Sequence, residues 1–201
     1  VRDPLLTRLA ESLELEGRRR IAIGEFKGGL KCYENLLSFS PGSAHSHYGM
    51  GFCLRASGEP ETAYLHFARA VAAAPEQIGY RMELAQVAVT VGEYAEADRQ
   101  YEEILRRKPD HAEALYRYAT CLATKERTDR NMARALTLAE QACRETGWQN
   151  REFAYGLANL YMDAGRVMEG MGLKRRLKEG GLPERAANPA PSSRSSDQTG
   201  R

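Results

Sequence analysis

Three prolines, Pro41, Pro75 and Pro109, recur with a 34-residue period, and the sequence between them repeats in the same way. In step with these prolines come glycines followed by glutamate, positions held by a small residue, and positions held by an aromatic ring. The matching sets are Gly24/Gly58/Gly92, Gly17/Gly51/Ala85, Gly29/Ala63/Ala97 and Tyr33/Phe67/Tyr101. A period of this length is typical of arrays in which each repeat is one pair of helices. The interval therefore predicts an all-α solenoid.

Each repeat carries the marks of two helices joined by a short turn. In the segment 78–108 the apolar and small residues fall at helical spacing, first at Leu84, Ala85 and Ala88 and then at Tyr94, Ala97, Tyr101, Ile104 and Leu105. Small residues let the two helices approach closely, and the aromatic ring fills the space beside them. Glycine separates the helices, and proline ends the second one because it cannot supply the next backbone donor.

Five such units account for most of the 201 residues. The expected units are about 4–41, 44–75, 78–109, 112–147 and 151–179, and they form one solenoid domain over residues 1–182. Asp3 and Pro4 predict the N-cap and the first residue of the opening helix. Residues 183–201 are rich in proline, serine, asparagine and alanine, and they are predicted to form a disordered tail.

The last two units depart from the regular pattern. Ala135, Ala139 and Ala142 come four residues later than the period requires, so the polar stretch 125–130 is predicted to form a longer loop within the fourth unit. In the fifth unit, two glycines predict a weak second helix, because each costs about 1 kcal/mol relative to alanine. A polar, poorly formed helix of this kind suits the terminal cap of a repeat array.

The repeated residues resemble the tetratricopeptide repeat (TPR) family over about residues 10–178. The third unit resembles the family most, at Leu84, Ala85, Gly92, Tyr94, Ala97, Tyr101, Ile104 and Pro109. The resemblance implies a right-handed superhelix of about five helix-turn-helix units, whose first helices line a concave face that binds a partner. Pentatricopeptide arrays, which bind RNA and have a similar period, are the nearest alternative, but the pattern of small, aromatic and proline positions argues against them.

Composition argues against two other classes of partner. The chain has 29 basic and 27 acidic residues, a net charge of +2, so a nucleic-acid partner is not expected. The short basic runs 18–20 and 174–176 are expected to be solvated faces. No apolar run approaches the ~20 residues that a membrane span needs. The four cysteines form no Cys-x-x-Cys motif and fall in predicted helices, which predicts buried, inert thiols and favours a cytoplasmic location.

No pattern in the sequence predicts a catalytic residue, a cofactor or a metal site. His45 and His47 are two residues apart and so do not share a helix face, and no third ligand lies nearby. The pair Gly49 and Gly51 has the spacing of half a phosphate loop, but it lies inside a predicted helix and follows no strand.

The resemblance directs the search for a binding surface to the first helix of each unit. Some TPR proteins grip the C-terminal carboxylate of chaperones with a lysine and asparagines at the fifth and ninth residues of this helix. Here those pairs are Glu14/Arg18, Tyr48/Phe52 and Met82/Gln86, so the clamp is absent and no co-chaperone role is expected.

The second, fifth, ninth and twelfth residues of each first helix define the predicted groove. Its centre mixes aromatic and apolar side chains with polar ones, a combination that suits an extended peptide or an amphipathic helix. The predicted partner-binding residues are Tyr48, Phe52, Arg55, Met82, Gln86, Val89, Tyr116, Thr120, Tyr155, Asn159 and Met162.

A non-enzymatic scaffold for protein–protein interaction is therefore the predicted function. The alternative is an accessory TPR module of a larger enzyme, or of a secretion or assembly protein, whose catalytic domain would lie upstream of Val1. Weak self-association through a loose terminal repeat is a further possibility.

Overall fold

The computed structural model describes residues 4–125 and 128–180, which form ten α-helices and no strand. The helices are α1 (Pro4–Ala22), α2 (Phe26–Phe39), α3 (Ala44–Ala56), α4 (Pro60–Ala73), α5 (Ile78–Val91), α6 (Tyr94–Arg107), α7 (Ala112–Lys125), α8 (Asp129–Glu145), α9 (Arg151–Asp163) and α10 (Val167–Lys178). The predicted N-cap Asp3 and the predicted disordered tail lie outside the described residues.

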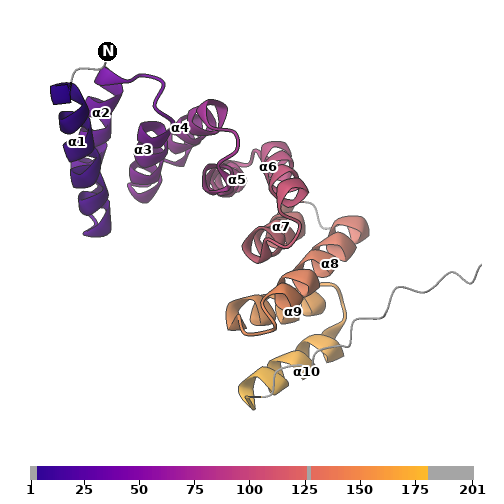
Figure 1. Cartoon of the computed structure of the whole chain (residues 1–201). Coiled ribbons are helices and arrows are strands. Elements are labelled where there is room, and N and C mark those ends of the chain that lie inside the picture. The colour runs from indigo at the N-terminus through magenta and orange to yellow at the C-terminus, as the bar shows by residue number, and fades with distance from the viewer. Residues whose placement is uncertain (1–3, 126–127, 181–201) are drawn as a thin grey trace, which may run out of the picture.

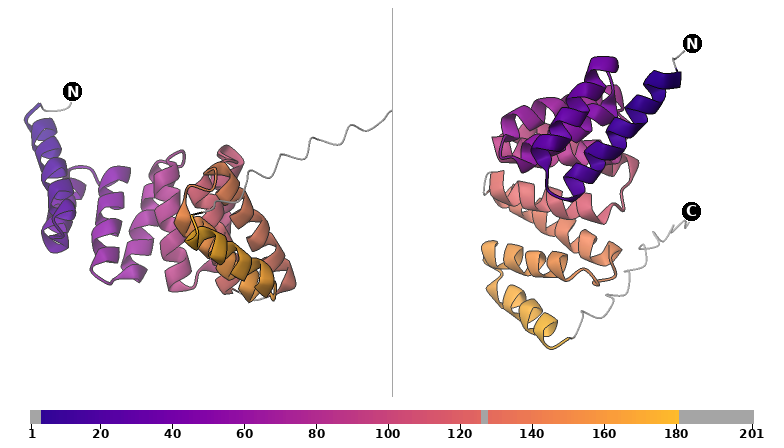
Figure 2. Two further views of the ribbon diagram at one scale, coloured as in Figure 1. Left: turned by 90° about the horizontal axis from the view of Figure 1, so that it is seen from below. Right: turned by 90° about the vertical axis from the view of Figure 1, so that its left-hand side faces the viewer.

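Each helix packs against the next one along the chain, from α1 on α2 to α9 on α10. The helices stack as antiparallel pairs into a curved rod, with α3, α5, α7 and α9 along the inner side of the curve (Figure 1). Helices α4, α6 and α8 lie along the outer side, and the same row of pairs is seen from two other directions in Figure 2. The all-α solenoid predicted from the 34-residue period is confirmed.

The small and aromatic positions of the repeat form the core between the helices. The rings of Tyr33, Phe67 and Tyr101 are at most 1% exposed. The Tyr33 ring of α2 lies between two glycines, Gly17 of α1 and Gly49 of α3, and a methyl group added to either one would press on the ring. Glycine at these positions therefore lets one aromatic side chain bind two neighbouring helices together.

A left-handed glycine closes each two-helix turn of the first three units. Gly92 ends α5 with φ of 84°, and Gly24 and Gly58 have φ of 79° and 85°. Glycine adopts this conformation without the strain that a side chain would cause, which explains why it recurs at these positions.

The repeated prolines act through their carbonyl oxygens as well as by ending helices. Arg81 Nε donates to the Pro75 carbonyl at 2.8 Å, and Gln141 Nε2 donates to the Pro109 carbonyl at 3.2 Å. The Nε2 atom of His47 lies 3.0 Å from the Pro41 carbonyl. Each of these three carbonyls thus has a side-chain partner, which fixes the link between successive units.

The prediction of a longer loop in the fourth unit is wrong. Helix α8 begins at Asp129 and has 17 residues, whereas α4 and α6 have 14 each, so helix takes up most of the extra length. Thr128 caps this helix early, because its side chain accepts a hydrogen bond from the backbone N–H of Asn131 at 3.2 Å. The buried alanines Ala135 and Ala139 keep the longer helix in contact with α7.

The two glycines of α10 have different roles. Gly170 is buried, and a Cβ atom there would lie 2.6 Å from the carbonyl oxygen of Ala158 and 2.5 Å from Cγ of Met162. It occupies the same small position as Gly29 and Ala63 in earlier units, so it permits close packing on α9. Lys174 stands where earlier units carry the buried aromatic ring, which suits a cap.

We expect Gly170→Ala to lower the free energy of unfolding by about 1.5 kcal/mol, because the backbone of α9 leaves no room for a methyl group. Gly172→Ala is the matched control, since nothing lies within 4 Å of the added methyl group. Better helix propensity is expected to raise its stability by up to about 1 kcal/mol. Denaturant titrations of both variants measure the difference, and equal effects would contradict the close contact.

Candidate partner-binding groove

The structure places all eleven predicted groove residues on the inner helices α3, α5, α7 and α9. They differ in accessibility. Asn159 is exposed, and most of the others are half-buried. Met82 is only 7% exposed and belongs to the hydrophobic core, so it packs beneath the surface of the groove.

The aromatic part of the groove lies on α3 and α5. The Tyr48 ring stacks on the Tyr80 ring with centroids 4.7 Å apart, and it meets the edge of Phe67 at 5.8 Å. Burial raises the pKa of both tyrosine hydroxyls above the ordinary value. Tyr80 is absent from the predicted set because it is the third residue of α5, a position that the sequence rule did not include.

The N-terminal end of the groove carries a small ionic cluster. Arg18 Nη2 contacts Glu14 Oε1 at 2.7 Å, and the His45 ring lies 3.3 Å from each of these side chains. His47 faces another way, toward His66 of α4. The two histidine side chains therefore do not converge on one point.

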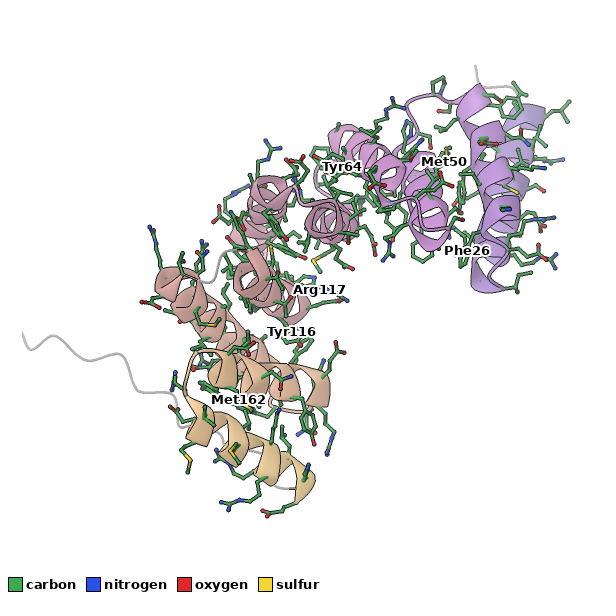
Figure 3. All side chains as sticks on the ribbon, turned by 180° about the vertical axis from the view of Figure 1, so that it is seen from behind. Phe26, Met50, Tyr64, Tyr116, Arg117 and Met162 are labelled. Atoms are coloured by element: carbon green, nitrogen blue, oxygen red, sulfur yellow. The ribbon has the colours of Figure 1, made fainter. Side chains whose placement is uncertain are left out.

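The centre of the groove is a hollow of about 300 Å³ between α5 and α7, closed on one side by Arg55 of α3. In Figure 3 the labelled Tyr116 and Arg117 lie on the inner side of the curve at this level. The hollow is lined by Arg55, Gln86, Val89, Thr90, Tyr101, Arg117, Thr120, Cys121 and Thr124. Only four of these belong to the predicted set.

Paired charges surround the hollow. Arg55 Nη2 contacts Glu83 Oε2 at 3.0 Å across α3 and α5, and the Arg55 guanidinium lies 5.1 Å from the centre of the Phe52 ring. On α7, Arg117 Nε donates to Glu113 at 2.8 Å. Burial raises the pKa of Glu83, while Arg55 and Arg117 act in the opposite direction. The hollow is therefore polar but close to neutral.

Glu83 and Arg117 are one repeat period apart, and both stand at the position that Gly49 holds in the second unit. This position was not among the second, fifth, ninth and twelfth residues from which the groove was predicted. Charged residues at the same repeat position of two neighbouring inner helices could have indicated it. Thr90 and Thr124 share another position, four residues after Gln86 and Thr120, and so lie on the same helix face.

The C-terminal part of the groove is partly filled by its own side chains. The Tyr116 ring stacks on Phe153 of α9 with centroids 4.4 Å apart and lies directly over Gly156. Arg151 approaches the Tyr155 ring at 5.9 Å. Tyr116 thus links α7 to α9, whereas the predicted residues Tyr155 and Asn159 are half-buried and exposed, respectively.

The four cysteines are free thiols in the interior of the protein. All are buried and unpaired, and burial raises the thiol pKa of Cys53 and Cys121 to about 11 and that of Cys143 to about 12. A thiol is a poor nucleophile at neutral pH when its pKa is this high. Within residues 4–125 and 128–180, no group of three or more histidine, cysteine or acidic side chains could hold a metal ion.

In the described part of the chain, none of the helices has both the length and the apolar character needed to cross a membrane.

Part of the chain matches a known family model. Residues 82–147 match the family model described as tetratricopeptide repeat. No curated protein sequence matches the chain.

Solved structures of similar fold cover most of the chain. A MamA crystal structure is 14% identical, with 86% of this chain and 92% of the other covered and a TM-score of 0.73. MamA from Desulfovibrio magneticus RS-1 is 15% identical, with 86% and 96% covered and a TM-score of 0.74. YrrB, described as a TPR protein with an unusual peptide-binding site, is 15% identical, with 88% and 92% covered and a TM-score of 0.68. At these identities the likeness concerns the fold alone.

Proposed function

We propose that this tetratricopeptide repeat chain is a non-enzymatic scaffold that binds a segment of a partner protein along the inner face of its solenoid. The observation that carries the proposal is the polar hollow between α5 and α7, whose lining residue Arg55 also lies over the half-buried Phe52 ring of α3. A concave surface of mixed polar and aromatic side chains is typical of peptide recognition. YrrB, a structure of similar fold, is described as having a peptide-binding site.

Two amides make the groove suitable for an extended backbone. The side chains of Gln86 and Asn159 form no hydrogen bond with any residue in the described ranges, although each lies on an inner helix. An amide group can donate to a carbonyl and accept from an N–H of a bound peptide. The hydroxyls of Thr90, Thr120 and Thr124 donate to their own helices and keep lone pairs for further N–H donors.

A site-specific photo-crosslinking experiment tests the proposal even while the partner is unidentified. A photoreactive amino acid is placed at Gln86 or Asn159 on the inner face, and at the exposed outer positions Ala72 or Ala95 as matched controls. In the native host we expect discrete adducts from the inner positions and none from the outer ones. Equal labelling from both faces, or labelling from the outer face alone, would contradict the groove.

The partner identified in this way permits a quantitative prediction. Thr120→Trp fills the hollow and is expected to weaken binding by at least about tenfold, because the bulky ring occupies the space of the peptide. Ala95→Trp, on the outer face, serves as the control and is expected to bind as wild type. Calorimetric titration measures both affinities, and circular dichroism verifies that helicity is unchanged.

A further inference from the structure

Two histidines join the helices of the second unit through an unusual contact. His47 of α3 is 7% exposed, and its Nδ1 atom lies 3.1 Å from Nδ1 of His66 on α4. The other nitrogen of the same ring, Nε2, lies 3.0 Å from the carbonyl oxygen of Pro41. One imidazole therefore connects α3, α4 and the segment that leads in from α2.

These contacts fix where the protons lie. A carbonyl oxygen only accepts hydrogen bonds, so Nε2 of His47 must carry a proton. Neutral His47 then has a bare Nδ1, which accepts from the protonated Nδ1 of His66. The pair can take up one more proton, on the outer Nε2 of His66. A second one would have to enter between the rings, where two N–H groups would face each other at 3.1 Å.

The charged surroundings also oppose protonation. Arg69 of α4 acts on both rings, and neither imidazole has a carboxylate partner within the described residues. Burial and Arg69 lower the pKa of both histidines, and the hydrogen bond to Pro41 only partly offsets this for His47. His45 is separate from the pair, because its ring contacts Glu14 and Arg18 of α1.

The same bridge recurs in the next unit with groups that do not titrate near neutral pH. One repeat period later the two positions are held by Arg81 and Gln100, and Arg81 contacts both the Pro75 carbonyl at 2.8 Å and the Gln100 side chain at 2.6 Å. In the fourth unit the corresponding residues are Leu115, in the apolar core, and Leu138, which is partly buried and packs against that core. Of these three units, only the second has histidine side chains at the two bridging positions.

We propose that His47 and His66 form an acid-sensitive clamp, which holds α3 against α4 at neutral pH and loosens on acidification, when a second proton breaks the hydrogen bond between the two rings. In the unfolded chain each imidazole takes up a proton near pH 6.5. The folded pair can bind a second proton only by breaking the hydrogen bond between the rings, so below that pH the unfolded state binds more protons than the folded state. Stability is therefore complete above about pH 6.5 and falls as the pH drops below it.

Two variants copy bridges that the chain already contains. His47→Arg with His66→Gln reproduces the third unit, and His47→Leu with His66→Leu reproduces the apolar pair of the fourth. Every other titratable group is kept. Between about pH 7.5 and pH 5.5 we expect the Tm of the wild-type chain to fall by about 3 °C more than that of either variant. Circular dichroism at several pH values measures this.

Nuclear magnetic resonance of the imidazoles gives an independent readout on the full chain. We expect titration midpoints of His47 and His66 below that of an ordinary histidine. As the pH falls, protection from hydrogen exchange, relative to the intrinsic rate at each pH, is expected to decrease in α3 and α4 before it does in α7. The clamp would be ruled out by ordinary midpoints for both rings. A variant that folds and shows the same pH dependence of Tm as the wild type would equally rule it out.

Discussion

Replacement of Gly49 by alanine is expected to lower the free energy of unfolding by about 3 kcal/mol. The added methyl group would point at the Tyr33 ring, and three ring carbons lie closer to it than atoms in van der Waals contact can. The ring has little room to move away, because α1 packs against its other side at Gly17. The contact is so close that a Cβ atom on Gly17 would be only 3.0 Å from two ring carbons. Relief therefore requires α2 and α3 to separate.

Denaturant unfolding followed by circular dichroism measures this effect. Gly79→Ala is the matched control, since Gly79 also lies in an inner helix and has nothing within 4 Å of an added methyl group. Its stability is expected to be equal to that of the wild type or slightly higher. A Gly49→Ala variant as stable as this control would show that the Tyr33 ring does not hold α1, α2 and α3 together.

Replacement of Arg81 by leucine is expected to cost about 3 kcal/mol, because it removes one buried and one partly buried hydrogen bond made by a charged group. Arg81 is 8% exposed, and it links α5 to α6 through Gln100 and to the preceding turn through the Pro75 carbonyl. The single substitution leaves the buried side-chain oxygen of Gln100 and the Pro75 carbonyl without this donor.

The control for Arg81 is the double variant Arg81→Leu with Gln100→Leu, which copies Leu115 and Leu138 of the fourth unit. Replacing both polar partners by apolar groups removes most of the penalty for an unpaired buried group, so the double variant is expected to recover most of the lost stability. A double-mutant cycle measures the coupling between the two residues. Additive losses would contradict the bridge.

The repeat determined the number and order of the helices, their approximate ends and their small and aromatic positions. All of these depend on local properties that recur once in every repeat period, such as the glycine at φ of 84° and the alanines that face a neighbouring helix. The sequence also predicted which helices line the inner face, through the family resemblance. The eleven residues chosen there remain a prediction about binding.

The pairing of side chains between helices was decided only by the tertiary structure. Tyr80 stacks on Tyr48, Glu83 pairs with Arg55, and Arg117 lines the hollow between α5 and α7. The 34-residue period contains no information about these contacts between units. The extra residues of the fourth unit extend α8 and do not form a longer loop, because Thr128 caps the helix early and the helix packs on α7. Local periodicity reports the hydrogen bonding within each helix, whereas these contacts join residues distant in sequence, so their geometry emerges only when the units stack.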